Sequence, residues 1–302
     1  MLKRQRMLLR LLDRAGSVAS RGWLVRMTFL VSGERRAWAS SPLYDFVPLG
    51  DGPGSFSLDR EIEALERDGH VAAADGGGLA LTPSGRAECA SIDPAHAAAV
   101  LGAWHRYDAA NAAALGARID GEFPWFTLNA TDPARRRVER PRAACALFTA
   151  GYRGLSIDGF LDGLLRRGIE RIVDVRANPA SRRLGFHKST LRKLAATVGI
   201  GYEHLPQLGV AKELRRDATS TGEINRMFED YAVRIRSQDA DLAAALALLK
   251  ERPSVLVCAE TAARDCHRSR LASALAERCA LPVVHLDLRA PGARGPDDGE
   301  ED

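Results

Sequence analysis

The sequence predicts an α/β fold for the C-terminal half of the chain, with a mainly parallel sheet and helices on both faces. From Cys145 onward, short apolar runs alternate with amphipathic segments, which is the pattern of strands separated by helices. A mostly α-helical domain is expected over 1–90, where helical periodicity dominates. The 302 residues, of which 46% are hydrophobic and 27% charged, favour a protein of two globular domains over a disordered or fibrous chain.

Three helices followed by a hairpin are predicted for this first domain. The expected helices cover 3–16, 21–33 and 57–71, with Ser20 as the cap of the second. Two short strands around a glycine-rich turn follow, and another helix begins at Thr82. Three helices and a β-turn-β wing together define a winged helix.

The segments 44–71 and 81–88 resemble the winged-helix modules of bacterial regulators. Such a module is expected to dock on duplex DNA, and the second helix offers Arg21 and Arg26 for phosphate contacts. A small helical domain used only for contacts with other proteins is the alternative.

Residues 91–142 are predicted to form an alanine-rich helix and a basic linker without chemistry of their own. The α/β domain then covers 143–289, and an acidic disordered tail covers 290–302. Since the last six residues carry five acidic groups and the whole chain has a net charge of +4, the rest of the chain carries about +9. This excess suits a polyanionic partner, but arginines on solvated faces explain it equally well. The same alternatives hold for the linker arginines, which are Arg135, Arg136, Arg137, Arg140 and Arg142.

The α/β domain has five predicted strands with helices between them. The strands are expected at 144–152, 169–177, 201–206, 254–259 and 282–288, and the helices at 156–168, 189–199, 223–237, 240–251 and 266–279. Ser156 and Ser189 are the predicted caps of the first two helices. Ligands of such sheets bind beyond the carboxyl ends of the strands. That rule places eight residues on one rim: Gly151, Tyr152, Asp174, Arg176, Leu205, Gln207, Cys258 and Glu260.

Four segments of this half carry a resemblance to a known family. They read "TAGYRGLSIDGFLDGLLRRGI", "IVDVRANPASRRLGFHKSTL", "YEHLPQLGVAKELR" and "LVCAETAARDCHRSRLA". In order and spacing they resemble the bacterial and archaeal family called domain of unknown function 488, from about Phe148 to Leu286. The residues that carry the resemblance are Gly151, Tyr152, Asp174, Arg176, Pro179, Tyr202, Leu208, Gly209, Cys258, Glu260, Cys266, His267 and Arg268.

The resemblance implies a shared fold and site, but no settled activity. Gln207 stands where the family often has Glu, and Val210 where Gly is common. If the family's carboxylate serves as an acid or base, this chain does without it.

The rim residues favour a site for a phosphate or another anion. Cys266 and His267 begin a helix, where free backbone N–H groups favour negative charge and are expected to lower the pKa of a thiol. The substrate-binding or anion-binding residues are predicted to be Tyr152, Asp174, Arg176, Arg182, Arg183, Tyr202 and Arg268. Salt bridges from the arginines to Asp174 or Glu260 are the alternative.

Catalysis at this site would involve Glu260, His267, Cys266 and Cys258. Glu260 is a candidate general acid or base, paired with Arg268 or Arg176. The two cysteines are open to three roles: nucleophile activated by His267, zinc ligand, or packing residue. Packing is favoured and no metal site is predicted, because the seven-residue gap between the cysteines is longer than in most structural zinc sites.

A reduced, cytoplasmic protein without a membrane segment is expected. The N-terminus lacks the pattern of a signal peptide, no apolar run approaches about 18 residues, and the five cysteines are odd in number and scattered.

These features favour a nucleic-acid-associated protein. The winged helix would dock on DNA, and the α/β domain would bind or process a nucleotide or base, in DNA repair or the processing of modified DNA. As an enzyme it would be a hydrolase or lyase. A transcriptional regulator that senses a small anionic ligand and a sulfur-handling enzyme without a DNA role are the alternatives. No cofactor and no oligomeric state can be assigned from the sequence.

Overall fold

The chain divides after Glu139 into two units, each with its own hydrophobic core. The structure is a computed structural model, and it describes residues 1–16, 18–33, 43–107, 112–210 and 220–289. The predicted tail lies outside these residues. The predicted connector does not stand apart, because Val100, Leu115 and Ile119 are buried in the first core. Alanine-rich helices show little contrast between their faces, so the sequence did not indicate that they pack.

The N-terminal unit contains helices and two small antiparallel sheets. Its elements are α1 (Lys3–Arg14), β1 (Val18–Ser20), α2 (Arg21–Ser32), β2 (Val47–Leu49), β3 (Gly52–Gly54), α3 (Phe56–Arg67), β4 (Val71–Ala74), β5 (Gly78–Leu81), α4 (Pro83–Cys89), α5 (Pro94–Tyr107) and α6 (Ala112–Glu122). The predicted hairpin is β4 and β5, and β1 joins it in the order β1-β5-β4. Ser20 and Thr82 are caps as predicted, whereas Ser55 caps α3 and that helix begins one residue before Ser57.

The C-terminal unit contains a parallel five-stranded sheet, so the predicted α/β class is confirmed. Its elements are β6 (Leu147–Gly151), α7 (Ile157–Arg166), β7 (Arg171–Asp174), α8 (Lys188–Thr197), β8 (Gly201–His204), α10 (Thr221–Arg236), α11 (Asp239–Glu251), β9 (Ser254–Cys258), α12 (His267–Ala276) and β10 (Val283–Leu286). Ser156 caps α7 as predicted, but α8 begins after His187, so Ser189 lies inside that helix.

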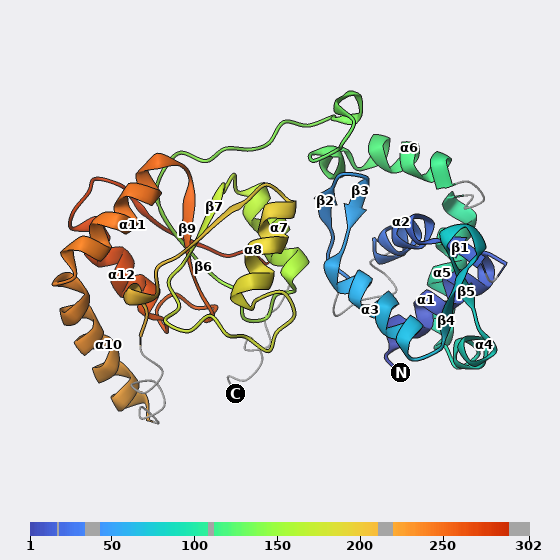
Figure 1. The fold of residues 1–302 in the computed structure, drawn as a ribbon, viewed down its shortest axis with the longest axis horizontal. Coiled ribbons are helices and arrows are strands. Elements are labelled where there is room, and N and C mark those ends of the chain that lie inside the picture. The colour runs from blue at the N-terminus through green and yellow to red at the C-terminus, as the bar shows by residue number, and fades with distance from the viewer. Residues whose placement is uncertain (17, 34–42, 108–111, 211–219, 290–302) are drawn as a thin grey trace. The chain divides into compact units, whose positions relative to one another are not determined.

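The strand order β10-β6-β9-β7-β8 decides where a ligand can approach. The crossovers after β6 and β7 run toward β8, and those after β8 and β9 run back toward β10. Because such crossovers are right-handed, the two directions place helices on opposite faces. Figure 1 shows α7 and α8 on one side of the sheet and α11 and α12 on the other. The connection after β9 therefore leaves on the face opposite to the connections after its neighbours β6 and β7. Parallel α/β sheets bind ligands at the strand ends where the connections diverge in this way.

Apolar side chains hold the second layer of helices on the sheet. Leu147 and Leu256 of the strands pack with Leu249 of α11 and Leu271 of α12 in one fully buried cluster. Each such side chain contributes about 1.5–3 kcal/mol by leaving water. Among the described residues, no helix is both long and apolar enough to cross a membrane.

Candidate functional site

A closed network of buried polar groups lies beyond β7. The Arg176 guanidinium donates to both carboxylate oxygens of Asp174, from Nε at 2.8 Å and from Nη2 at 2.5 Å. Tyr202 donates its hydroxyl to the same carboxylate at 2.6 Å. The remaining guanidinium nitrogen of Arg176 donates to the Tyr152 hydroxyl at 2.8 Å and to the Phe186 carbonyl at 3.0 Å. The predicted residues meet here, but they bind one another.

Electrostatics fix the charge states of this network. Burial alone lowers the pKa of Arg176, but the bonds to Asp174 outweigh it and raise that pKa. Burial and the bond to Asp174 raise the pKa of Tyr202, so its hydroxyl stays protonated and donates. The network is thus an ion pair with its partners satisfied. Of the two roles that the sequence left open for Arg176, the salt bridge to Asp174 is the one observed.

Glu260 lies on the neighbouring loop and pairs with an arginine that the sequence analysis missed. Its carboxylate contacts Arg153 at 2.9 Å, and its side chain is 32% exposed. Arg268 reaches the backbone oxygen of Glu260 and, at 2.7 Å, that of Thr261. The expected pairing of Glu260 with Arg268 or Arg176 is therefore replaced by Arg153, which follows the adjacent strand β6.

Gly151 allows this loop to cross the end of β6. A Cβ atom built on Gly151 would lie 1.8 Å from the Glu260 backbone oxygen. The loop is held there by the backbone N–H groups of Tyr152 and Arg153, which donate to the Ala259 oxygen at 3.2 and 2.8 Å. Backbone therefore fills part of the crevice between β6 and β9.

Cys258, Cys266 and His267 form a second buried cluster beside β9. Nδ1 of His267 lies 3.6 Å from Sγ of Cys258 and 3.8 Å from Sγ of Cys266. The chain brings them together because Cys258 ends β9 and the other two begin α12, which returns against the same strand. A hydrogen bond with the Cys258 thiol and burial raise the pKa of Cys266, so the expected lowering by the helix end is wrong.

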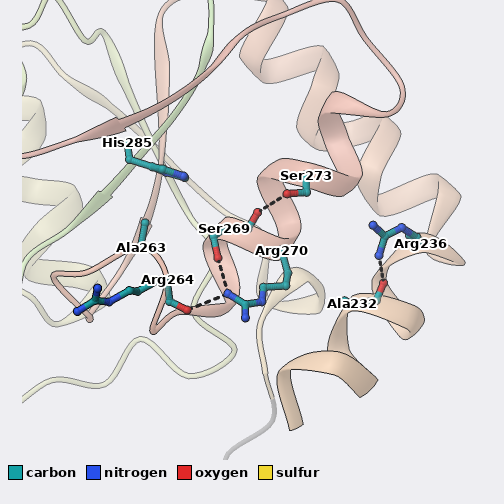
Figure 2. Close-up of a pocket in the computed structure, with 8 residues that line it drawn as sticks. All are labelled: Ala232, Arg236, Ala263, Arg264, Ser269, Arg270, Ser273 and His285. Carbon is teal, nitrogen blue, oxygen red and sulfur yellow. Dashed lines mark hydrogen bonds between the residues drawn. The ribbon is translucent and has the colours of Figure 1, made fainter. Parts of the chain in front are cut away.

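A basic pocket lies where α10, α12 and the loop before α12 meet β10 (Figure 2). It has a volume of about 460 Å³, and its lining residues are Ala232, Arg236, Ala263, Arg264, Ser269, Arg270, Ser273 and His285. None of these residues was predicted for the site. Arg270, two residues after Arg268 on α12, was the available signal, because it extends a run of positive charge past the helix start.

Figure 2 shows how the cations of the pocket are held. Arg270 donates to the backbone oxygen of Arg264 at 2.8 Å and to the Ser269 hydroxyl at 3.1 Å. Arg236 donates to the Ala232 oxygen and pairs with Glu277 outside the pocket. Burial and the charge of Arg268 lower the pKa of His285, which keeps its imidazole neutral at pH 7.

The other predicted site residues belong to neither cluster. Arg182 and Arg183 are exposed on the loop after β7, and Arg183 donates to the Leu155 oxygen at 2.8 Å. In the N-terminal unit, Arg21 pairs with Asp59 of α3 at 3.2 Å. Arg26 reaches the Asp51 oxygen at 3.5 Å.

The fold and these clusters define the C-terminal unit as a parallel α/β domain with polar groups gathered at the strand ends. Residues 156–275 match the model of a family described as Domain of unknown function DUF488. The match lies within the C-terminal half, whose motifs resemble the same family, and it includes β9, the cysteine cluster and most of α12. The match does not reach the N-terminal unit. A search of curated proteins found no match.

Proposed function

We propose that the C-terminal unit binds a phosphate-bearing ligand of the nucleotide or nucleic-acid class in the basic pocket. The observation that carries this proposal is the chemistry of the lining, which combines three guanidinium groups and an imidazole with two serine hydroxyls and includes no carboxylate. Arginine presents its donors in a fork that fits phosphate oxygens bidentately. A pocket of this composition favours anions over neutral ligands.

Arg270 is the residue on which the proposal depends most. It lies at the centre of the lining in Figure 2, and its guanidinium packs 5.3 Å from the centre of the Phe228 ring. Its guanidinium donates to a backbone oxygen and to a hydroxyl, and no ion pair of Arg270 occurs within the described ranges. A charge held by neutral groups can still bind an anion.

Calorimetric titration of the full chain with inorganic pyrophosphate, ATP and a short single-stranded DNA tests the proposal. Arg270→Ala should weaken binding of the preferred ligand at least about tenfold, because a charge-assisted hydrogen bond contributes roughly 1.5–3 kcal/mol. Arg166→Ala is the control, since Arg166 is also a helical arginine, but it lies on α7, pairs with Asp162 and does not line the pocket. Equal affinity of Arg270→Ala and the wild type would refute the pocket assignment.

We propose that the N-terminal unit is a winged-helix module. Its support is the order helix, strand, helix, helix and hairpin, with β1 completing the sheet. In that arrangement α3, which precedes the hairpin, occupies the recognition position. Its acids Asp59 and Glu61 pair with Arg21 and Arg4 of the neighbouring helices.

Docking of this unit on duplex DNA is consequently the weaker half of the nucleic-acid proposal. Of the two arginines expected to contact phosphates, Arg21 pairs with Asp59 of α3 and Arg26 reaches the Asp51 oxygen between β2 and β3, and α3 carries four acids against two arginines. Binding of the full chain to a labelled duplex at increasing salt tests it, since about three phosphate contacts give a slope near −3 in log affinity against log salt. Binding that is absent at low salt would leave protein contacts as the role of this unit.

A further inference from the structure

Three side chains that metal ions favour lie together at the end of β9, and none of them lines the basic pocket. Cys258, Cys266 and His267 are each 1% exposed. One donor atom from each lies within 4.8 Å of the other two. Two sulfur atoms and one imidazole nitrogen form a set that selects zinc or another thiophilic ion over magnesium or calcium.

The two distances between sulfur and nitrogen fit a bound ion. Zinc lies about 2.3 Å from thiolate sulfur and about 2.0–2.1 Å from imidazole nitrogen, so tetrahedral geometry separates neighbouring sulfur and nitrogen ligands by roughly 3.5 Å. The observed Sγ to Nδ1 separations are 3.6 Å for Cys258 and 3.8 Å for Cys266. Hydrogen bonds between the same groups span similar distances, so the distances need support from a second observation.

The hydrogen bonding of His267 supplies that observation. Nε2 lies 3.2 Å from the backbone oxygen of Val175, which only accepts hydrogen bonds. Nε2 therefore carries the hydrogen, and the lone pair of Nδ1 points toward both sulfurs. A ring nitrogen fixed by a backbone carbonyl while the other faces the ion is the usual second-shell arrangement of metal-binding histidines.

The buried charge of Arg268 fits thiolates in this place. Arg268 is 1% exposed, and it donates to two backbone oxygens. Within the described part of the chain its Nε has no partner and no carboxylate pairs with it. Burying a cation beside neutral groups is costly, whereas thiolate sulfurs on a metal ion would place negative charge near it.

We propose that Cys258, Cys266 and His267 bind one Zn²⁺ ion. On binding, each thiol loses its proton to solvent, so the ion and two thiolates form a neutral set suited to a buried place. Three protein ligands are also the number found in catalytic zinc sites, where water or substrate takes the fourth position. This proposal is independent of the proposed pocket ligand, because the metal ligands and the lining of the pocket share no residue.

Metal analysis of the full chain, purified without a histidine tag under reducing conditions, tests the proposal. The wild type should contain about one zinc per chain, and Cys258→Ser, Cys266→Ser and His267→Gln should each contain less than about a tenth of that. Cys279→Ser and Cys89→Ser are controls that should keep the zinc, since neither cysteine lies in the cluster.

A second measurement on the wild type decides the question if the variants fail to fold. After removal of zinc by a chelator, Co²⁺ should restore thermal stability and produce thiolate-to-cobalt charge-transfer absorption. Absence of both zinc and a cobalt spectrum in the reduced, folded wild type would overturn the proposal. An intact mass that shows a Cys258–Cys266 disulfide in protein purified without reductant, with no metal, would assign the pair to redox chemistry instead.

Discussion

Two buried arginines at the same edge of the sheet have opposite surroundings. Arg176 follows β7 and is 3% exposed, and Arg268 begins α12 after β9 and is 1% exposed. Arg176 binds both oxygens of the Asp174 carboxylate. Among the described residues, the guanidinium of Arg268 donates to the backbone oxygens of Glu260 and Thr261 and to no carboxylate.

The difference distinguishes an arginine whose charge is neutralised by a buried carboxylate from one whose charge can still act on other groups. The donors of Arg176 are occupied by its carboxylate and by neutral oxygens, so the pair acts as one neutral unit that fixes the strand end. The charge of Arg268 is not neutralised within the described residues, and it acts on the Cys266 thiol and on His285. Burial of an arginine therefore says little about binding until its partners are known.

The largest expected effect follows from removing the carboxylate of the buried ion pair between Asp174 and Arg176. Asp174→Asn leaves the Arg176 cation buried without a carboxylate, which should cost about 3–5 kcal/mol of unfolding free energy. Urea denaturation of the variant and the wild type measures this loss of unfolding free energy. Asp162→Asn, which breaks the helical pair with Arg166, should cost less than about 1 kcal/mol. Similar losses in the two variants would mean that Arg176 is not held by Asp174.

A smaller loss is expected from the hydroxyl that completes the same network. Tyr202→Phe removes a hydrogen bond to a charged acceptor and should cost about 1.5–3 kcal/mol. Tyr231→Phe is the matched control, because the Tyr231 hydroxyl donates to the neutral Leu208 oxygen at 2.7 Å. That control should lose about 0.5–1.5 kcal/mol. Equal losses would remove the distinction between charged and neutral acceptors.

Arg268→Met should be tolerated better than the opening of the Arg176 pair. It strands no buried carboxylate, and because Glu260 is half-buried and Thr261 is exposed, water can reach the two backbone oxygens, so each lost hydrogen bond should cost about 0.5–1.5 kcal/mol. The matched variant Arg176→Met strands Asp174 and should lose about 3–5 kcal/mol. Chemical denaturation of both variants in one buffer gives the comparison, and a larger loss for Arg268→Met would reverse it.

The sequence predicted the strands and helices of the sheet well because each is a separate apolar run between turn residues. It also placed Asp174, Arg176 and Cys258 on one edge, since parallel strands end together. The sequence did not predict which groups these arginines would pair with. "DVR" and "CHR" look alike as acid or thiol beside arginine, yet Arg176 turns back to its own strand while Arg268 reaches across to a loop.

The basic pocket was not predicted because its residues come from four separated segments. Arg236 ends α10, Arg264 precedes α12, Arg270 lies within α12 and His285 lies on β10. No local spacing links these positions. The core role of α5 and α6 was missed for a different reason, since small alanine side chains give a weak hydrophobic pattern.

The smallest expected effect concerns pH. Because burial and Arg268 lower the pKa of His285 in the folded state, the unfolded chain binds that proton at higher pH. Stability should therefore fall as pH drops below about 6.5 and level off below the folded pKa. His285→Gln should flatten this part of the profile of urea midpoint against pH. A wild-type profile identical to that of His285→Gln would contradict the assignment.

The strand order also determines when each strand can find its partners while the chain is being synthesised. β6 is the first strand of its sheet to leave the ribosome, but its partners are the last two, since Phe148 pairs with Val255 and with Val284. Until those segments are synthesised, both edges of the apolar strand β6 are unpaired, and unpaired apolar strand edges favour aggregation. The pairing of β7 with β8 needs no such delay. Chains stalled before β9 are therefore the ones that depend most on chaperones.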